Sequence, residues 1–100
     1  MNNFDTCMAF VAGAKSGKGS NLFFENGIIY SYGTHFPMAR FVGDTIVMHK
    51  EKYSRSTSKH QSYLRCAIEY GRRDYIYTDT IEEMNRLFIV YRDSHKKEDK

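Results

Sequence analysis

The sequence lacks any apolar run that approaches the length of a membrane span. Its opening residues, MNNFDTC, lack the basic head and the apolar core of a signal peptide. Both absences predict a cytosolic chain with no membrane partner. The sequence also lacks internal repeats and a linker long enough to separate domains, so residues 1–100 are expected to form a single domain. Residues 93–100 are a charged stretch that we expect to form a frayed tail.

Cysteine is scarce, and no cluster of metal-ligating side chains is apparent. Cys7 and Cys66 are isolated, without a CxxC spacing, so they are expected to be free thiols in a cytosolic chain. No histidine has a partner at the spacing of a metal site. We therefore expect neither a metal nor a cofactor.

The complete Walker pattern is missing as well. GAKSGKGS has three residues between Gly13 and Gly17 where the Walker pattern needs four, and Gly19 follows Lys18 where Ser or Thr is needed. The residues after it favour a strand, so the helix dipole that would face the phosphates is absent. We interpret this segment as a flexible basic loop, in which Lys15 and Lys18 are available to a polyanion.

Strand patterns dominate the first half of the chain. The apolar run at residues 6–12 predicts a short strand. In LFFENGIIYSY, the pair Asn26-Gly27 predicts a two-residue type I′ hairpin, and a second hairpin is expected around residues 43–44. Pro37 lacks a backbone N–H and therefore marks an edge, a bulge or a bend of the sheet. An exposed edge there would also allow a homodimer.

Two amphipathic helices are expected in the second half. Ser58 and Gln61 fit a capping box at the start of a helix over about residues 59–70. A strand at residues 74–78 separates it from a helix over about residues 80–92, which Thr80 and Glu83 would cap. The order of these elements predicts an α+β fold, in which an antiparallel β-meander of about four to five strands carries both amphipathic helices on one face.

The stretch at residues 52–68 combines a polar turn, a helix start and a histidine. Ser56, Thr57 and Ser58 lie where a helix start offers unpaired N–H groups, which suits an anion such as phosphate. The plain alternative is that these hydroxyls only cap the helix. His60 falls on the apolar face of the predicted helix, where it would form a hydrogen bond inside the core.

Histidine also offers a route to catalysis. A pair drawn from His35, His49 and His60 could supply an acid and a base. Histidines without a chemical role explain the same residues equally simply. No recognised catalytic signature supports the pair, so His35 and His60 are weak catalytic candidates and the sequence leans towards a non-enzymatic protein.

Basic residues are concentrated in the middle of the chain. The net charge is +3, and residues 50–73 carry seven basic side chains against Glu51 and Glu69. Cations interleaved with aromatic rings are typical of a nucleic-acid surface, although the same cluster could simply solvate a helix. The predicted nucleic-acid-binding residues are Lys15, Lys18, Lys50, Lys52, Arg55, Lys59, Arg65, Arg72 and Arg73, with Tyr53 and Tyr63 available to stack on bases.

A resemblance covers about residues 24–68. The runs YSYGTHFPMA and YSRSTSKHQS make the chain similar to small uncharacterised proteins encoded by tailed bacteriophages. The resemblance implies a phage or prophage origin and a place in the cytoplasm of the bacterial host cell. It also suggests a role in adjusting host machinery or blunting host defences, but it carries over no activity.

Three functional hypotheses follow. The first is a non-enzymatic protein that binds nucleic acid through the basic surface centred on residues 50–73. The second is a protein-binding inhibitor of host defence, of the anti-CRISPR kind, whose partner is a host nucleic-acid-binding protein. The third is a small histidine-dependent nuclease or phosphotransfer enzyme.

Overall fold

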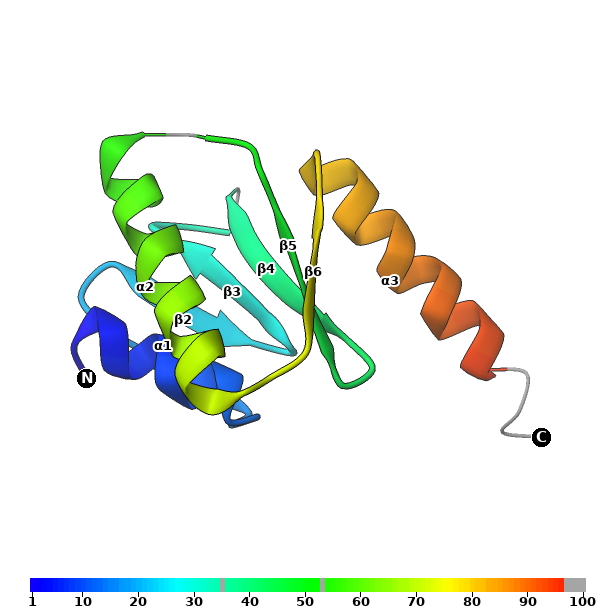
Figure 1. The fold of residues 1–100 in the computed structure, drawn as a ribbon, viewed down its shortest axis with the longest axis horizontal. Helices are drawn as coiled ribbons and strands as arrows, with labels where there is room; N and C mark the ends of the chain where they lie inside the picture. Colours follow the sequence, from blue (N-terminus) through cyan, green and yellow to red (C-terminus); the bar gives the residue numbers. More distant parts are fainter. Residues whose placement is uncertain (35, 53, 97–100) are drawn as a thin grey trace.

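A computed structural model describes residues 1–34, 36–52 and 54–96 of the chain. The described residues form three helices and one six-stranded sheet (Figure 1). In chain order the elements are α1 (Asn3–Val11), β1 (Ser16–Lys18), β2 (Leu22–Glu25), β3 (Ile28–Ser31), β4 (Pro37–Val42), β5 (Thr45–His49), α2 (Arg55–Gly71), β6 (Tyr75–Thr78) and α3 (Ile81–Lys96).

The strands from β1 to β5 form an antiparallel meander in which each strand pairs with the next one along the chain. The predicted hairpin at Asn26-Gly27 is confirmed, because both residues have positive φ angles, of 54° and 78°, as a type I′ turn requires. The hairpin at residues 43–44 is confirmed too, with Val42 paired to Thr45. Part of the predicted flexible loop is ordered, since β1 pairs along β2.

β6 extends the meander as a parallel strand. Its residues pair with β5 in a register that places Tyr77 beside Met48. A parallel neighbour needs a crossover connection, and α2 supplies it. The predicted α+β class is therefore confirmed, and the sheet is mixed because the chain crosses over between β5 and β6.

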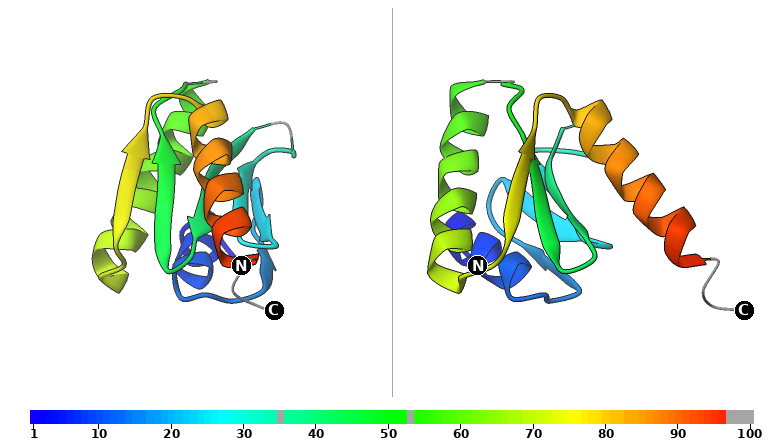
Figure 2. Two further views of the ribbon diagram at one scale, coloured as in Figure 1. Left: turned by 90° about the vertical axis from the view of Figure 1, so that its right-hand side faces the viewer. Right: turned by 45° about the vertical axis from the view of Figure 1, so that its right-hand side comes forward.

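The helices cover both faces of the sheet. α1 and α2 pack together on one face, whereas α3 lies against β4, β5 and β6 on the other (Figures 1 and 2). We expected both amphipathic helices on one face. α3 takes the opposite face because α1, which was predicted as a strand, already shares the first face with α2.

The N-terminal apolar run is helical, so the strand predicted at residues 6–12 is wrong. Cys7, Phe10 and Val11 are buried at helical spacing, and the Asn2 side chain caps the helix by accepting from the Asp5 N–H at 2.7 Å. A short apolar run is compatible with the period of a helix and with that of a strand. Here the segment is helical because that conformation buries its apolar residues against α2 and the sheet.

The main core lies between the layer of α1 and α2 and the sheet. Phe10 joins both sides, because its ring centroid lies 5.6 Å from that of Phe24 and 5.0 Å from that of Phe41. The close approach of α1 and α2 depends on Gly71, where an added Cβ would lie 2.8 Å from the Val11 side chain.

α2 begins four residues earlier than predicted, so the predicted cap at Ser58 is wrong. Ser54 is the cap, and its Oγ accepts from the Thr57 N–H at 3.1 Å. The helix extends towards its N-terminus because Thr57, His60 and Gln61 are all buried and continue the stripe that faces the core. The predicted cap of α3 is confirmed, since Thr80 Oγ1 accepts from the Glu83 N–H at 3.1 Å.

α3 also runs further than predicted, to Lys96, and residues 97–100 of the expected tail lie outside the described residues. Pro37 begins β4, which is paired on both sides, and the β3–β4 register shifts beside it. Of the three predicted roles, the edge is therefore wrong, and the register shift agrees with a bulge or a similar irregularity.

Replacement of the two candidate cap residues separates their roles. Ser54→Ala removes the acceptor for the Thr57 N–H and should lower the free energy of unfolding by about 1 kcal/mol. Ser58→Ala changes a residue inside the first turn and should have little effect. Urea unfolding followed by circular dichroism measures both variants, and an equal loss for Ser58→Ala would contradict the assignment of the cap.

Candidate nucleic-acid interface

A basic pocket lies between α2 and the adjoining ends of β5 and β6. It is a cavity of about 290 Å³. We call it the basic pocket, and its lining residues are Met38, Met48, His49, Lys50, Lys52, Gln61, Leu64, Arg65 and Tyr77. Among these described residues, none carries a carboxylate.

The crossover explains why a hollow forms at this position. β5 and β6 run parallel, so their carboxyl ends lie side by side, and the chain leaves β5 there to begin α2. In open sheets with parallel strands, such carboxyl ends are the usual place for a ligand. The same geometry brings His49, at the end of β5, near Tyr77 of β6.

The floor of the basic pocket is apolar and its rim is cationic. Met38, Met48 and Leu64 are almost completely buried and form the floor. Lys50, Lys52 and Arg65 are exposed at the rim. The crossover thus brings together three of the predicted nucleic-acid-binding residues.

Hydrogen bonds hold parts of the rim in place. Gln61 donates from Nε2 to the Glu51 carbonyl at 3.1 Å and accepts from Lys52 Nζ at 3.5 Å. Lys50 lies 3.8 Å from an Asp79 carboxylate oxygen, but both side chains are largely exposed, so this ion pair is weak. An anion can therefore compete for Lys50.

His49 fixes the chain that leaves β5. Its Nε2 lies 2.6 Å from the Pro37 carbonyl, and its Nδ1 accepts from the Glu51 N–H at 3.1 Å. We assign the ring hydrogen to Nε2, because a carbonyl can only accept. Burial lowers the pKa of His49, so the ring is neutral and both nitrogens serve the structure.

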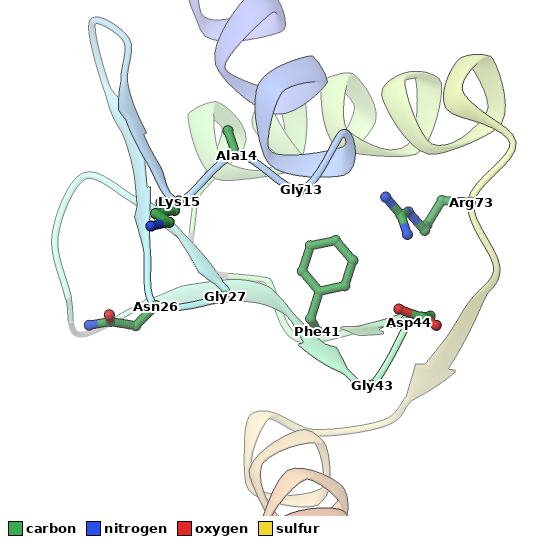
Figure 3. Close-up of a pocket in the computed structure, with 9 residues that line it drawn as sticks. All are labelled: Gly13, Ala14, Lys15, Asn26, Gly27, Phe41, Gly43, Asp44 and Arg73. Atoms are coloured by element: carbon green, nitrogen blue, oxygen red, sulfur yellow. The ribbon is translucent and has the colours of Figure 1, made fainter.

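A second hollow, of about 580 Å³, contains Lys15 and Arg73 (Figure 3). Figure 3 shows them on opposite sides of Phe41, with Asp44 on the side of Arg73. The Arg73 guanidinium donates from Nε and Nη2 to the Val11 carbonyl, at 3.1 and 2.7 Å, and lies 5.2 Å from the Phe41 ring centroid. Arg73 therefore caps the end of α1, a role that the sequence analysis missed.

The other predicted basic residues are spread over the surface. Arg55 and Lys59 lie on the exposed side of α2, and Lys18 lies on the edge strand β1. Arg72 ends α2 in the left-handed conformation, with φ of 53°. Tyr63 is half-buried, with Lys59 Nζ 5.9 Å from its ring centroid.

The residues around the start of α2 also have separate environments. Ser56 lines a small cavity with His60, whereas Thr57 is completely buried and Ser58 is half-buried. His60 is 3% exposed, and its Nδ1 lies 2.8 Å from Ser31 Oγ. The predicted residues His35 and Tyr53 lie outside the described residues. Of the predicted histidine set, His49 and His60 are described, and they line different cavities.

Tyr77 is an aromatic residue of the pocket that the predicted set of nucleic-acid-binding residues did not contain. The alternation in DYIYT places Tyr75 and Tyr77 on the same face of β6, and this pattern was the available signal. Neither cysteine is in the pocket. Cys7 and Cys66 are free, and burial raises the pKa of the Cys7 thiol to about 12, so Cys7 is not a nucleophile at neutral pH.

Stability should fall as the solution becomes acidic. Burial lowers the pKa of His49 and of His60, and Lys59 adds to the effect at His60. The unfolded chain, with histidine pKa values of about 6.5, then binds protons that the folded chain does not. The stabilisation is complete above that pH and is lost as the pH falls towards the lowered values, by at most about 1.4 kcal/mol per pH unit for each histidine.

Urea unfolding at pH 7.5, 6.5 and 5.5 measures this loss. His60→Gln should remove part of the slope of the unfolding free energy against pH, while Ser62→Ala, as a control on the same helix, should keep all of it. A wild-type unfolding free energy that stays constant across this range would contradict the buried, neutral state of both rings.

In the part of the chain that the structure describes, no helix is long and apolar enough to cross a membrane. The same residues contain no group of three or more His, Cys, Asp or Glu side chains that could hold a metal ion. No protein-family model, curated protein or solved structure matches the chain. What the basic pocket can do therefore follows from its own geometry and chemistry.

Proposed function

We propose that this chain binds nucleic acid through the basic pocket and the adjoining exposed side of α2, without catalysing a reaction on it. The observation that carries the proposal is the convergence of Lys50, Lys52 and Arg65 above an apolar floor. Cations at a rim neutralise phosphates, and the release of their counterions drives association. The proposed setting is the cytoplasm of a bacterial cell that carries a phage or prophage, as the resemblance implies.

A flexible single strand suits this pocket better than a duplex. The cavity is about the size of one nucleotide, and one wall is the partly exposed ring of Tyr77, on which an unpaired base can stack. Arg55 and Lys59 lie one turn apart on the exposed side of α2 and would contact the phosphates that follow. The bases of a duplex are paired and stacked, so they cannot reach Tyr77 without flipping out.

A charge-matched pair of triple variants tests the proposal. Fluorescence anisotropy with a labelled single-stranded oligonucleotide at low salt should show that K50A/K52A/R65A binds at least about tenfold more weakly than wild type. The slope of log K against log salt should also decrease by about two, since each lost single-strand phosphate contact contributes about 0.7.

The control variant K15A/K18A/R86A loses the same charge outside the basic pocket and should bind nearly as well as wild type. Equal weakening of both variants would show that only net charge matters and would overturn the assignment to the pocket. If wild type shows no binding at low salt to single-stranded or duplex probes, nucleic-acid binding itself is ruled out.

A second candidate function, protein binding, is favoured by the open edge of β6. Tyr75, Ile76 and Tyr77 are all exposed, and residues 75–78 contain no proline, lysine or bulge to block pairing. Leu87 and Val90 of α3 are exposed as well. An unprotected apolar strand at a sheet edge is a ready partner for another strand.

A second copy of this chain is the occupant that we propose for this edge. Antiparallel pairing of two β6 strands about Ile76 would place Ile76 opposite the partner's Ile76 and Tyr75 opposite the partner's Tyr77. Such an interface is self-complementary, as a twofold dimer requires. It would replace the edge beside Pro37 that the sequence suggested, because β4 is paired on both sides.

Sedimentation analysis of Ile76→Lys tests the dimer. Wild type should sediment as a dimer, and Ile76→Lys should sediment as a monomer because a charge in the paired edge opposes association. Ile89→Lys changes a similarly exposed apolar residue of α3 and should remain dimeric. A monomeric wild type would overturn the homodimer and leave a host protein as the partner for this edge.

A further inference from the structure

A small polar cavity of about 170 Å³ lies at the start of α2, away from the basic pocket. We call it the α2-start pocket, and its lining residues are Asn3, Asn21, Tyr32, Ser56, Lys59, His60 and Tyr63. These described lining residues include one cation, Lys59, and no carboxylate. Its size suits a single small ion or group, because pockets for larger ligands begin at about 300 Å³.

His60 contributes a buried ring with one nitrogen unused. The residue is 3% exposed, and its Nδ1 is hydrogen-bonded to Ser31 Oγ. Nε2 has no hydrogen-bond partner among the described residues. Within the described chain, Arg40 Nε is the only side-chain nitrogen or oxygen that is both fully buried and without a partner. His60 Nε2 also lacks a partner but is not in that class, so this atom is not sealed from solvent. Nε2 is therefore accessible from the cavity that the ring lines.

A chain of hydroxyl groups fixes which nitrogen carries the hydrogen. Ser54 Oγ donates to Thr57 Oγ1 at 3.1 Å, Thr57 Oγ1 lies 3.3 Å from Ser31 Oγ, and Ser31 Oγ lies 2.8 Å from His60 Nδ1. Each hydroxyl hydrogen has an acceptor if Ser54 donates to Thr57, Thr57 donates to Ser31, and Ser31 donates to His60 Nδ1. Nδ1 then accepts, and we assign the ring hydrogen to Nε2, where it points into the cavity.

The surroundings of Nε2 favour negative charge. Burial lowers the pKa of His60, and so does Lys59, so the ring stays neutral and acts as a donor through Nε2–H. The backbone N–H groups of Arg55 and Ser56, in the first turn of α2, have no partner among the described residues, and the helix dipole is positive at this end. The described lining of the cavity therefore offers a neutral ring donor and one cation, and it contains no carboxylate.

We propose that the α2-start pocket binds a phosphate group, either as inorganic phosphate or as a terminal phosphomonoester. His60 Nε2 donates from the buried side, Lys59 neutralises charge from the rim, and Ser56 supplies a hydroxyl. Of the residues predicted for an anion site, Ser56 lines this pocket, whereas Thr57 acts through the hydroxyl chain and Ser58 is not part of the lining. The phosphomonoester source rests on the proposed binding of nucleic acid, and the inorganic source does not.

The experiment follows the ring nitrogens by ¹⁵N-detected histidine spectra of the full chain. Before any addition, His60 should carry its hydrogen on Nε2. Titration with inorganic phosphate should then shift the His60 Nε2 signal in a saturable way and leave the His49 signals unchanged, since both His49 nitrogens are already bonded. A hydrogen on Nδ1, or no shift of His60 with phosphate, would overturn the proposal.

Two matched cations test the rim. Lys59→Ala should weaken phosphate binding about tenfold, as expected for a lost charged hydrogen bond. Arg86→Ala removes the same charge from α3, outside both the lining residues and the proposed nucleic-acid contacts, and should leave binding within about twofold of wild type. Equal effects of the two variants would mean that general surface charge holds the phosphate and would overturn the site.

Two oligonucleotides distinguish the sources. Tighter binding of a 5′-phosphorylated strand than of its 5′-hydroxyl counterpart, with the same His60 shift, supports the phosphomonoester. Equal binding of the two strands, together with the shift in inorganic phosphate, supports the free ion. The variant K50A/K52A/R65A should keep the phosphate shift, so the failure of one proposal can be told from the failure of the other.

Discussion

The parallel crossover from β5 through α2 to β6 is the constraint on which the rest of the structure depends. A parallel strand cannot follow its neighbour through a tight turn, so the chain must cross the face of the sheet, and α2 does this. The crossover brings the carboxyl ends of two strands to the start of α2 and creates the basic pocket between them. It also places β6 at the edge of the sheet, where α3 can pass to the opposite face.

α3 is attached to that opposite face by a few specific contacts. Met84 is completely buried, and Arg40 of β4 lies 3.7 Å from the centroid of the Phe88 ring while donating to Asn85 at 2.9 Å. The buried Arg40 Nε has no partner among the described residues, so this contact leaves one hydrogen-bond donor unsatisfied, which reduces its net stabilisation. The contacts that attach α3 therefore come mainly from its first two turns, whereas α2 presents a buried stripe from Thr57 to Ile68.

Local signals predicted the parts of the fold that depend on neighbouring residues. Asn26-Gly27 specified its turn through two positive φ angles, and Thr80 specified the start of α3 through a hydrogen bond three residues away. The sequence could not predict α1, because a short apolar run has no distinct period until its burial is known. The true cap at Ser54 was hidden for a similar reason, since Thr57 is a poor helix residue that burial and hydrogen bonding make acceptable.

In the candidate site, too, local features were predictable from the sequence and tertiary contacts were not. The excess of positive charge at residues 50–73 was visible in the sequence, but the convergence of Lys50, Lys52 and Arg65 depends on the crossover and was not. Arg73, which was assigned to a phosphate, is held by the Val11 carbonyl across the core, a contact that no local pattern contains. His60 was correctly predicted to face the core, but its partner Ser31, like the partner Pro37 of His49, comes from a different strand.

The topology of β6 also has a kinetic consequence. Every pairing in the meander from β1 to β5 is between sequence neighbours, so these contacts close short loops and form with little entropic cost. β6 pairs with β5 only after the whole of α2 is in place, and α3 then packs against β4, β5 and β6, so we expect this unit to dock after the meander. Tyr77 belongs to this unit and the three rim cations do not, so we expect the aromatic wall of the basic pocket to form after its charged rim.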